Sequence, residues 1–212
     1  KMYQKAGLQK TQVKYVPTIE ESAGRGKVTF EIAEAPKIKI HRMDFVGAKA
    51  FTQKKLRKAI KTRRHWMFSW ITGSGVLKDD QFAEDKEKLA DFFRNEGYID
   101  FEIKEVQFDQ INPKRMAIRF MVEEGTQYKV GAVEIKGNKL FPTEDIMKGF
   151  VVEGKVKKPE MTVGKTFTPK GLDQDLESIR DFYGAKGYID TWVKPIKNPN
   201  TEKGTMDLVY EI

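Results

Sequence analysis

The chain has 212 residues, of which 33% are charged and 39% hydrophobic, and its mean hydropathy is -0.59. The absence of cysteine excludes disulfide bonds and thiolate metal sites, and no apolar stretch approaches the roughly 18 residues that a membrane-spanning helix needs. The formal net charge of +8 favours acidic partners such as anionic lipid, nucleic acid or acidic protein faces.

A repeat with a period of 90 residues organises the chain. Gly97-Tyr98-Ile99-Asp100 recurs as Gly187-Tyr188-Ile189-Asp190, at an offset of 90. The same offset relates Gly47 to Gly137, Phe51 to Phe141, Asp85 to Asp175, and Phe120 to both Phe30 and Tyr210. We therefore predict three segments: the C-terminal part of a truncated repeat in 1–35, and complete repeats in 36–125 and 126–212. Lys1 corresponds to Asp91 inside a predicted helix and Ile212 ends a predicted strand, so we expect chain before and after this segment.

The elements of one repeat follow from apolar periodicity and from capping signals. Alternating apolar residues indicate strands, and apolar residues at helical spacing indicate helices. Thr52 is a plausible N-cap, and Gly97 is placed to end a helix in the left-handed conformation. In chain order we predict strand 38–45, a helix from Thr52, an irregular stretch 62–78, a helix from 79 or 80 to Gly97, strand 98–109, a turn at 112–113 and strand 116–123. The next repeat gives strand 128–135, helices 143–150 and 169–186, and strands 188–196 and 205–212. The predicted fold class is α+β: tandem β-α-α-β-β units, each a three-stranded mixed sheet with two helices on one face.

The first strand of each hairpin has an apolar pattern that changes phase. Its apolar residues switch from one alternation to the other, which predicts a β-bulge near Lys104-Glu105. The same three-residue step between apolar residues recurs at Val193 and Ile196 and at Val13 and Val16, and Pro195 in the last repeat is tolerated chiefly at an edge or a bulge. We therefore predict that this strand is a sheet edge that is protected against aggregation, used for docking, or both. The residues predicted to bind a partner are Phe101, Ile103, Lys104, Glu105, Val106, Phe108, Val193 and Ile196.

A basic segment gives a second candidate surface. No acidic residue occurs between Phe45 and Lys78, and Lys54, Lys55, Lys58 and Lys61 form a candidate surface for anionic partners. The alternative is a solvated helix face. The aromatic residues Trp66, Phe68 and Trp70 are predicted to pin the loop to the core. Because no recognised nucleic-acid-binding motif is present, no nucleic acid partner is expected.

The sequence contains few residues in arrangements that support catalysis. The two histidines, His41 and His65, are not paired with other metal-ligating residues at a useful spacing. The acidic pairs are explained by helix capping and strand-end solvation, and no serine lies in a nucleophile-elbow context. We expect no catalytic residue, no metal and no cofactor.

The order of these motifs resembles the POTRA domain, in particular the tandem POTRA domains of the BamA family of outer-membrane protein assembly factors. The resemblance rests on the first-strand motif at 133–138 with Leu140-Phe141, on the helix endings at 92–98 and 182–188, and on the junction at 122–130. The aromatic loop at 66–70 is most similar to the third POTRA domain of that family, so the segments would be the second to the fourth. Ala48 departs from the asparagine that often follows the turn glycine.

The resemblance implies a location and a set of partners. It implies a non-enzymatic array on the periplasmic side of the bacterial outer membrane, attached to the membrane through a C-terminal β-barrel that is absent from this chain. The implied partners are unfolded outer-membrane proteins and accessory assembly lipoproteins. The implied mechanism is β-augmentation, in which an incoming strand pairs with an exposed sheet edge. The alternatives are the POTRA region of a related secretion or translocation barrel, and a basic module that binds anionic lipid or nucleic acid. We also expect two short linkers between the repeats, one at 35–37 that Pro36 stiffens and one at 125–127 where Gly125 permits rotation.

Overall fold

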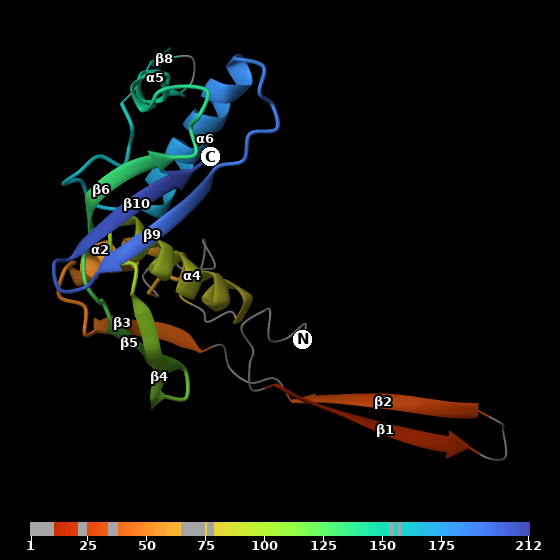
Figure 1. The fold of residues 1–212 in the computed structure, drawn as a ribbon. Coiled ribbons are helices and arrows are strands. Elements are labelled where there is room, and N and C mark those ends of the chain that lie inside the picture. Colours follow the sequence, from red (N-terminus) through yellow and green to blue (C-terminus); the bar gives the residue numbers. More distant parts are fainter. Residues whose placement is uncertain are drawn as a thin grey trace. The chain divides into compact units, whose positions relative to one another are not determined.

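The computed structural model describes residues 11–20, 25–33, 38–64, 75, 79–152, 155–156 and 158–212. Its elements (Figure 1) are β1 (Gln12–Glu20), β2 (Arg25–Ala33), β3 (Lys39–Val46), α2 (Gln53–Ala59), α4 (Asp79–Asn95), β4 (Glu102–Asn112), β5 (Arg115–Glu123), β6 (Lys129–Lys136), α5 (Thr143–Lys148), β7 (Val151–Val152), β8 (Lys155–Val156), α6 (Pro169–Ala185), β9 (Lys194–Asn200) and β10 (Thr205–Glu211). The chain forms two compact units, Lys1–Leu89 with Ile103–Glu123, and Ala90–Glu102 with Glu124–Ile212.

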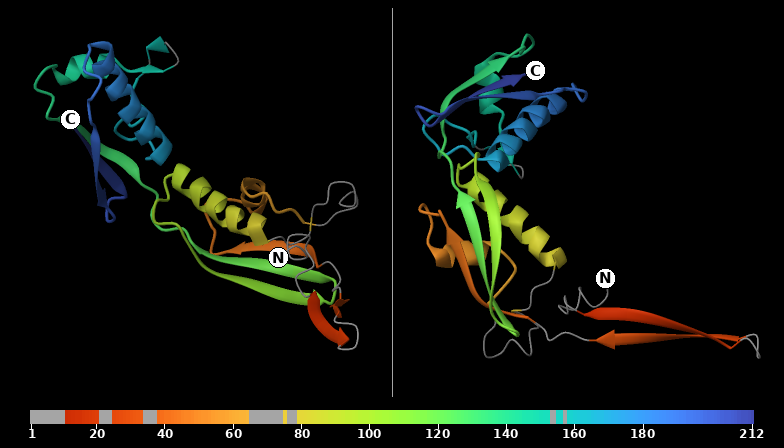
Figure 2. Two further views of the ribbon diagram at one scale, coloured as in Figure 1. Left: turned by 90° about the vertical axis from the view of Figure 1, so that its right-hand side faces the viewer. Right: turned by 90° about the horizontal axis from the view of Figure 1, so that it is seen from below.

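The first unit contains a three-stranded sheet in the order β3-β5-β4. The outer strand β3 runs parallel to the central strand β5, so that Phe45 lies opposite Phe120. The rings of Phe45 and Phe120 stack with centroids 5.1 Å apart, and Phe82 of α4 contacts Phe120 at 5.6 Å. Both α2 and α4 lie on the same face of this sheet (Figure 2). The predicted α+β arrangement is therefore confirmed.

The second unit contains an equivalent sheet in the order β6-β10-β9. The central strand β10 pairs parallel with β6 and antiparallel with β9, so the sheet is mixed. Alternate residues of β10 are buried, with Leu208 and Tyr210 each 1% exposed, and they pack in one cluster with Leu176 and Ile179 of α6. The helix begins at the N-cap Thr168, whose side chain accepts a hydrogen bond from the backbone N–H of Gly171.

The helix boundaries agree with the predicted capping signals. The Thr52 hydroxyl accepts a hydrogen bond from the Lys55 N–H at 3.3 Å, and α4 begins at Asp79. Gly97 follows α4 with φ +92°, in the left-handed region that glycine enters without a steric penalty. The predicted helix start and stop are therefore both confirmed in this repeat.

The first hairpin strands begin later than predicted. We predicted strands from residues 98 and 188, whereas β4 begins at Glu102 and β9 at Lys194. The residues in between belong to the helix endings, because the N–H groups of Tyr98 and Tyr188 donate to carbonyls of the last helical turns. These bonds satisfy carbonyl groups that a helix end otherwise leaves unpaired, and they delay the extended conformation.

The predicted change of phase in the first hairpin strand is wrong for two of the three hairpins. In β1–β2 and in β9–β10 the strands pair residue for residue without a shift. The shifts lie instead in the first strand of each complete repeat, at 40–42 and at 130–133. Val193 precedes β9 and points into the core, which explains its spacing from Ile196 without a bulge.

In β4 the ion pairs support the predicted change of phase. Lys104 pairs with Glu123 at 2.9 Å, and Asp109 pairs with Arg119 at 2.6 Å. Glu123 and Arg119 are four residues apart on one strand and therefore lie on one face of the sheet. Lys104 and Asp109 are five residues apart, so in a regular strand their side chains would point to opposite faces. Both nevertheless pair with residues on the same face, which supports a change of phase between them.

One buried carboxylate in each repeat holds the loop that follows the first helix. Asp85 accepts hydrogen bonds from the N–H groups of Lys61 and Thr62, at 2.6 and 2.8 Å. Asp175 accepts from the N–H groups of Glu160 and Met161, at 2.7 and 2.9 Å, and from the Tyr210 hydroxyl at 3.0 Å. Burial raises the pKa of Asp175, and burial together with the Asp175 carboxylate raises the pKa of Tyr210.

The residues that join the two repeats are held by hydrogen bonds within the second unit. Gln127 donates from Nε2 to the Glu96 carbonyl at 2.9 Å, and the Tyr128 hydroxyl donates to Asp100 at 2.8 Å. A Cβ at Gly125, whose φ is +72°, would lie 2.8 Å from the Cβ of Asp100. These contacts all lie within the second compact unit, so the expected rotation at this linker stays a prediction.

Some sequence predictions lie outside the described residues. These are the aromatic segment 66–70, the linker at 35–37 and His65. Among the residues that the structure does describe, none of the helices combines the length and the apolar character that crossing a bilayer requires.

The hydroxyl group of Tyr183 gives a first prediction. Tyr183 is 3% exposed, and its buried hydroxyl has no hydrogen-bond partner among the residues that the structure describes. The equivalent residue of the preceding repeat, 90 positions earlier, is Phe93. Burying a hydroxyl group without a hydrogen bond costs desolvation free energy, and replacing tyrosine by phenylalanine removes that cost. We therefore expect Tyr183→Phe to raise the free energy of unfolding by about 0.5–1 kcal/mol. Urea denaturation measures this. Tyr210→Phe, which loses a hydrogen bond to Asp175, is the opposite control and should lower stability by about 1 kcal/mol.

Candidate functional site

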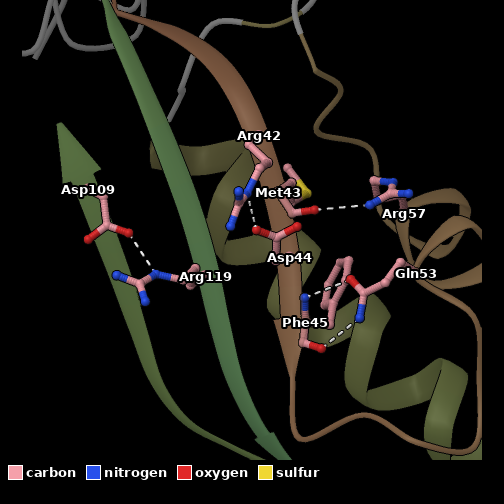
Figure 3. Close-up of polar contacts among 8 residues, drawn as sticks. All are labelled: Arg42, Met43, Asp44, Phe45, Gln53, Arg57, Asp109 and Arg119. Atoms are coloured by element: carbon pink, nitrogen blue, oxygen red, sulfur yellow. Dashed lines mark hydrogen bonds and ion pairs between the residues drawn. The ribbon is translucent and has the colours of Figure 1, made fainter. Parts of the chain in front are cut away.

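The outer edge of β3 is occupied by side chains of α2 (Figure 3). Gln53 donates from Nε2 to the Phe45 carbonyl at 2.7 Å and accepts from the Phe45 N–H at 2.9 Å, as a neighbouring strand would. Arg57 donates to the Met43 carbonyl at 3.1 Å, and the Ile40 N–H donates to the Gly75 carbonyl at 2.8 Å. Four backbone groups on this edge are therefore already hydrogen-bonded.

A loop occupies the start of the outer edge of β6. The Val130 N–H donates to the Lys165 carbonyl at 2.8 Å, and the Gly164 N–H donates to the Val130 carbonyl at 2.8 Å. Lys129 forms an isolated bridge with Thr166 on the same side. An incoming strand would have to displace this loop.

Two prolines occupy β9, the other edge of the second sheet. Pro195 lies opposite Tyr210 and Pro199 lies opposite Met206. Being four residues apart, their nitrogens face the same side of the strand, and neither nitrogen carries a hydrogen. Lys194 and Lys197 are exposed on this strand. Proline and lysine on an edge both oppose pairing with another chain.

Among the described residues, the outer edge of β4 shows none of these features along Glu105–Asp109. With 11 residues, β4 is the longest strand of the described chain, and it contains neither proline nor glycine. In the described ranges, no loop or helix backbone is hydrogen-bonded along Glu105–Asp109. An edge strand of this kind presents a row of N–H and C=O groups that a further strand can use.

Two of the residues predicted to bind a partner lie in the core, and this corrects the sequence prediction. Phe101 is 6% exposed, precedes β4 and stacks on Phe93 with ring centroids 4.0 Å apart. Val193 is 1% exposed and precedes β9. Both side chains are buried because the chain is still turning at these positions, so neither is available on the strand surface.

The other predicted residues lie on the two edge strands. Ile103 and Val106 are half-buried, whereas Lys104 and Glu105 are exposed. Phe108 is 46% exposed, although its ring lies 5.4 Å from that of Phe82 in α4. Ile196 is half-buried on β9. Only β4 therefore combines several predicted residues with an open backbone edge.

Two features of the candidate site, an exposed apolar side chain and an ion pair, were not predicted from the sequence. Ile111, at the end of the strand, is 52% exposed, and Asp109 is paired with Arg119. The hydrogen bond from Arg119 lowers the pKa of Asp109, so the pair stays charged at neutral pH (Figure 3). The role of Gln53 in closing β3 was also missed, because a glutamine after an N-cap carries no pattern that reveals its tertiary partner.

The lysine residues predicted to bind anionic partners differ in their contacts. Lys54, Lys55 and Lys58 are exposed, and Lys55 lies over the Phe51 ring at 4.4 Å. Lys61 donates to Glu84 at 2.8 Å, and this bond lowers the pKa of Glu84. The described residues contain no group of three or more acidic or histidine side chains that could hold a metal ion.

Comparison with known proteins identifies the repeat. The family model POTRA, described as a surface antigen variable number repeat, matches residues 38–125 and 128–212. The outer membrane protein assembly factor BamA of Neisseria meningitidis is 27% identical over 97% of this chain, which spans 25% of that relative's length. In solved structures, the chain matches BamA POTRA3-5 of Haemophilus influenzae over 100% of its length and 75% of that chain, with a TM-score of 0.51 and 15% identity. It also matches BamA of Haemophilus ducreyi, lacking POTRA domains 1-3, over 82% of its length and 29% of that chain, with a TM-score of 0.54 and 12% identity. The chain therefore belongs to the POTRA family and carries two copies of its repeat.

Proposed function

We propose that this chain receives extended segments of other proteins by β-augmentation at the outer edge of β4. The observation that carries the proposal is the contrast among the four sheet edges. Gln53 and Arg57 occupy β3, the loop at 164–166 occupies β6, and Pro195 and Pro199 interrupt β9. Within the described residues of these two three-stranded sheets, β4 alone has neither a proline nor a backbone hydrogen bond to a loop or helix along Glu105–Asp109.

The chemistry of this edge suits a receptor for many sequences. A paired strand is held by backbone hydrogen bonds, each of which contributes about 0.5–1.5 kcal/mol whatever the side chains are. Phe108 and Ile111, which are 46% and 52% exposed, add apolar contacts without demanding one partner residue. Affinity is then modest and tolerant of sequence, which a receptor for unfolded chains requires.

The wider role follows from the relatives, of which this chain spans about a quarter. We infer a non-catalytic scaffold at the periplasmic side of the bacterial outer membrane, in a factor that assembles outer-membrane proteins. Its partners would be unfolded outer-membrane proteins and accessory assembly lipoproteins, and a C-terminal barrel would attach it to the membrane. The working units would be the repeats 36–125 and 126–212, with 1–35 as the end of a preceding repeat.

Proline substitution in β4 tests the proposal. Lys104→Pro and Glu105→Pro, made separately, each remove one backbone N–H from β4, and a variant that still folds normally has lost an N–H that pairing with β5 does not require. The probe is a fluorescent ten-residue peptide with alternating apolar and polar residues, as in a barrel strand. For the variant that keeps the wild-type unfolding midpoint, we expect a loss of peptide affinity of at least about ten-fold, measured by fluorescence anisotropy.

The prolines of β9 provide the matched control. Replacing Pro195 and Pro199 together by threonine restores two N–H groups to that edge, so we expect a second peptide-binding site to appear. A folded β4 variant that binds the peptide as tightly as the wild type would refute the proposal. An identical affinity for a peptide that is N-methylated at alternate residues, and so cannot pair along one edge, would refute it as well.

A further inference from the structure

Four phenylalanine rings form an aromatic row through the first compact unit, from the outer strand β3 to the edge strand β4. The Phe45 ring stacks on Phe120 with centroids 5.1 Å apart, and Phe120 lies 5.6 Å from Phe82 of α4. Phe82 in turn lies 5.4 Å from Phe108 of β4. Each separation falls in the range of about 4.5–7 Å that paired aromatic rings prefer. The aromatic row thus leads from the core to the edge of the sheet.

The aromatic row is exposed at its β4 end. Phe45 is 2% exposed and Phe120 is fully buried, whereas Phe82 is half-buried and Phe108 is 46% exposed. Among the described residues, Phe82 supplies the only ring contact of Phe108. The Phe108 ring therefore has surface left for a further aromatic ring.

The change of phase in β4 directs Phe108 toward α4. Lys104 pairs with Glu123 on the face of the sheet away from the helices, so Ile103 lies on the helix side. In a regular strand Phe108, five residues after Ile103, would point to the opposite face. Instead its ring contacts Phe82 of α4. Bulges often redirect a side chain beside a functional site, and here the redirected side chain is the exposed end of the aromatic row.

The second repeat lacks the aromatic row. The residues 90 positions later in the chain are Ile135, Tyr210, Leu172 and Asn198. Asn198 lies opposite Asp207 on β9, the edge strand that contains two prolines. The fold therefore does not require the four rings, and the repeat that has them is the one whose hairpin edge is free of proline.

We propose that Phe108 and Phe82 select segments that place an aromatic side chain on the face toward α4. The preference rests on the proposed strand reception at β4, and it names the class of segment that this edge holds best. A strand paired with β4 directs alternate side chains to the helix side, where a ring next to Phe108 extends the aromatic row by one member. Such a contact contributes beyond the area that it buries, so other segments still bind but aromatic ones bind more tightly.

Three fluorescent ten-residue peptides test this preference. They alternate threonine with phenylalanine, leucine or cyclohexylalanine, and each ends in two lysines for solubility. Cyclohexylalanine keeps the ring size of phenylalanine without its π electrons and is more hydrophobic, so burial alone favours it. In fluorescence anisotropy we expect the 212-residue chain to bind the phenylalanine peptide at least about five-fold more tightly than either of the others. Phe108→Leu and Phe82→Leu, made separately, should each reduce this ratio to less than about two-fold.

Ile111→Ala is the matched variant. Ile111 is 52% exposed on the same strand but lies on the face of Asp109, away from α4. Its replacement should weaken all three peptides by the same factor and leave the ratio unchanged. The unfolding midpoint of each variant is measured first, and Phe108→Leu decides alone if Phe82→Leu does not fold.

The possible failures can be told apart. If the wild type binds the phenylalanine and cyclohexylalanine peptides equally well, the aromatic preference is wrong and strand reception at β4 stands. If Phe108→Leu folds and keeps the wild-type ratio, the aromatic row is not the selecting element. If the wild type binds none of the three peptides, strand reception itself is wrong, and the preference falls with it.

Discussion

Asp175→Ala is expected to lower the free energy of unfolding of the β6-β10-β9 sheet and its helices by about 3–5 kcal/mol. The side chain is 1% exposed and accepts three hydrogen bonds. Its removal leaves the N–H groups of Glu160 and Met161 and the Tyr210 hydroxyl without an acceptor. Each buried donor without a partner costs about 1–3 kcal/mol, although some of this is recovered if water enters.

The measurement is urea denaturation monitored through the amide exchange of β10, because β10 reports on this unit alone. Asp181→Ala is the matched control, because Asp181 is exposed on the same helix, and its effect should stay within about 0.5 kcal/mol. Asp85→Ala, which removes an acceptor of two bonds rather than three, should destabilise the β3-β5-β4 sheet by a smaller amount. Equal midpoints for the Asp175 and Asp181 variants would contradict the assigned role.

Gly137→Ala is expected to destabilise the same unit by about 3 kcal/mol or more. Gly137 has φ +81°, and an added Cβ would overlap the carbonyl oxygen of Ile212. Strain in the left-handed region contributes roughly 1–2 kcal/mol, and displacement of the last residue of the sheet supplies the rest. Thermal unfolding followed by circular dichroism measures the loss.

Gly164 separates the two contributions. It has φ +85°, almost the same as Gly137, but a Cβ there would meet nothing within 4 Å. Gly164→Ala therefore carries only the backbone strain and should cost roughly 1–2 kcal/mol. If both variants melt at the same temperature, the close approach of Ile212 has no energetic consequence and the interpretation fails.

Local signals and the repeat were sufficient to predict the architecture. The N-cap at Thr52, the left-handed glycine at Gly97 and the alternation in β10 each depend on neighbours within a few residues, and the structure has all three. The 90-residue offset strengthened each prediction, because a weak helix or strand signal in one repeat recurred at the equivalent position of the other.

The site could be predicted only in part, because edges are closed by tertiary contacts. That Gln53 satisfies both backbone groups of Phe45 depends on where α2 lies, which residue spacing does not specify. Phe101 and Val193 were placed on strands because their apolar character suits a strand as well as a core. The helix-ending turns that bury them are decided by hydrogen bonds to the last helical turn.

The parallel pairing of the first and last strands has a consequence for synthesis of the chain. Lys39 pairs with Arg115 and Lys129 pairs with Thr205, so each first strand finds its partner 76 residues later. Until the last strand arrives, the apolar side chains of the first have no sheet to join, and loop closure over that distance must come first. Each repeat should therefore become resistant to proteases in one step, when its final strand emerges, and the array should mature in increments of a whole repeat.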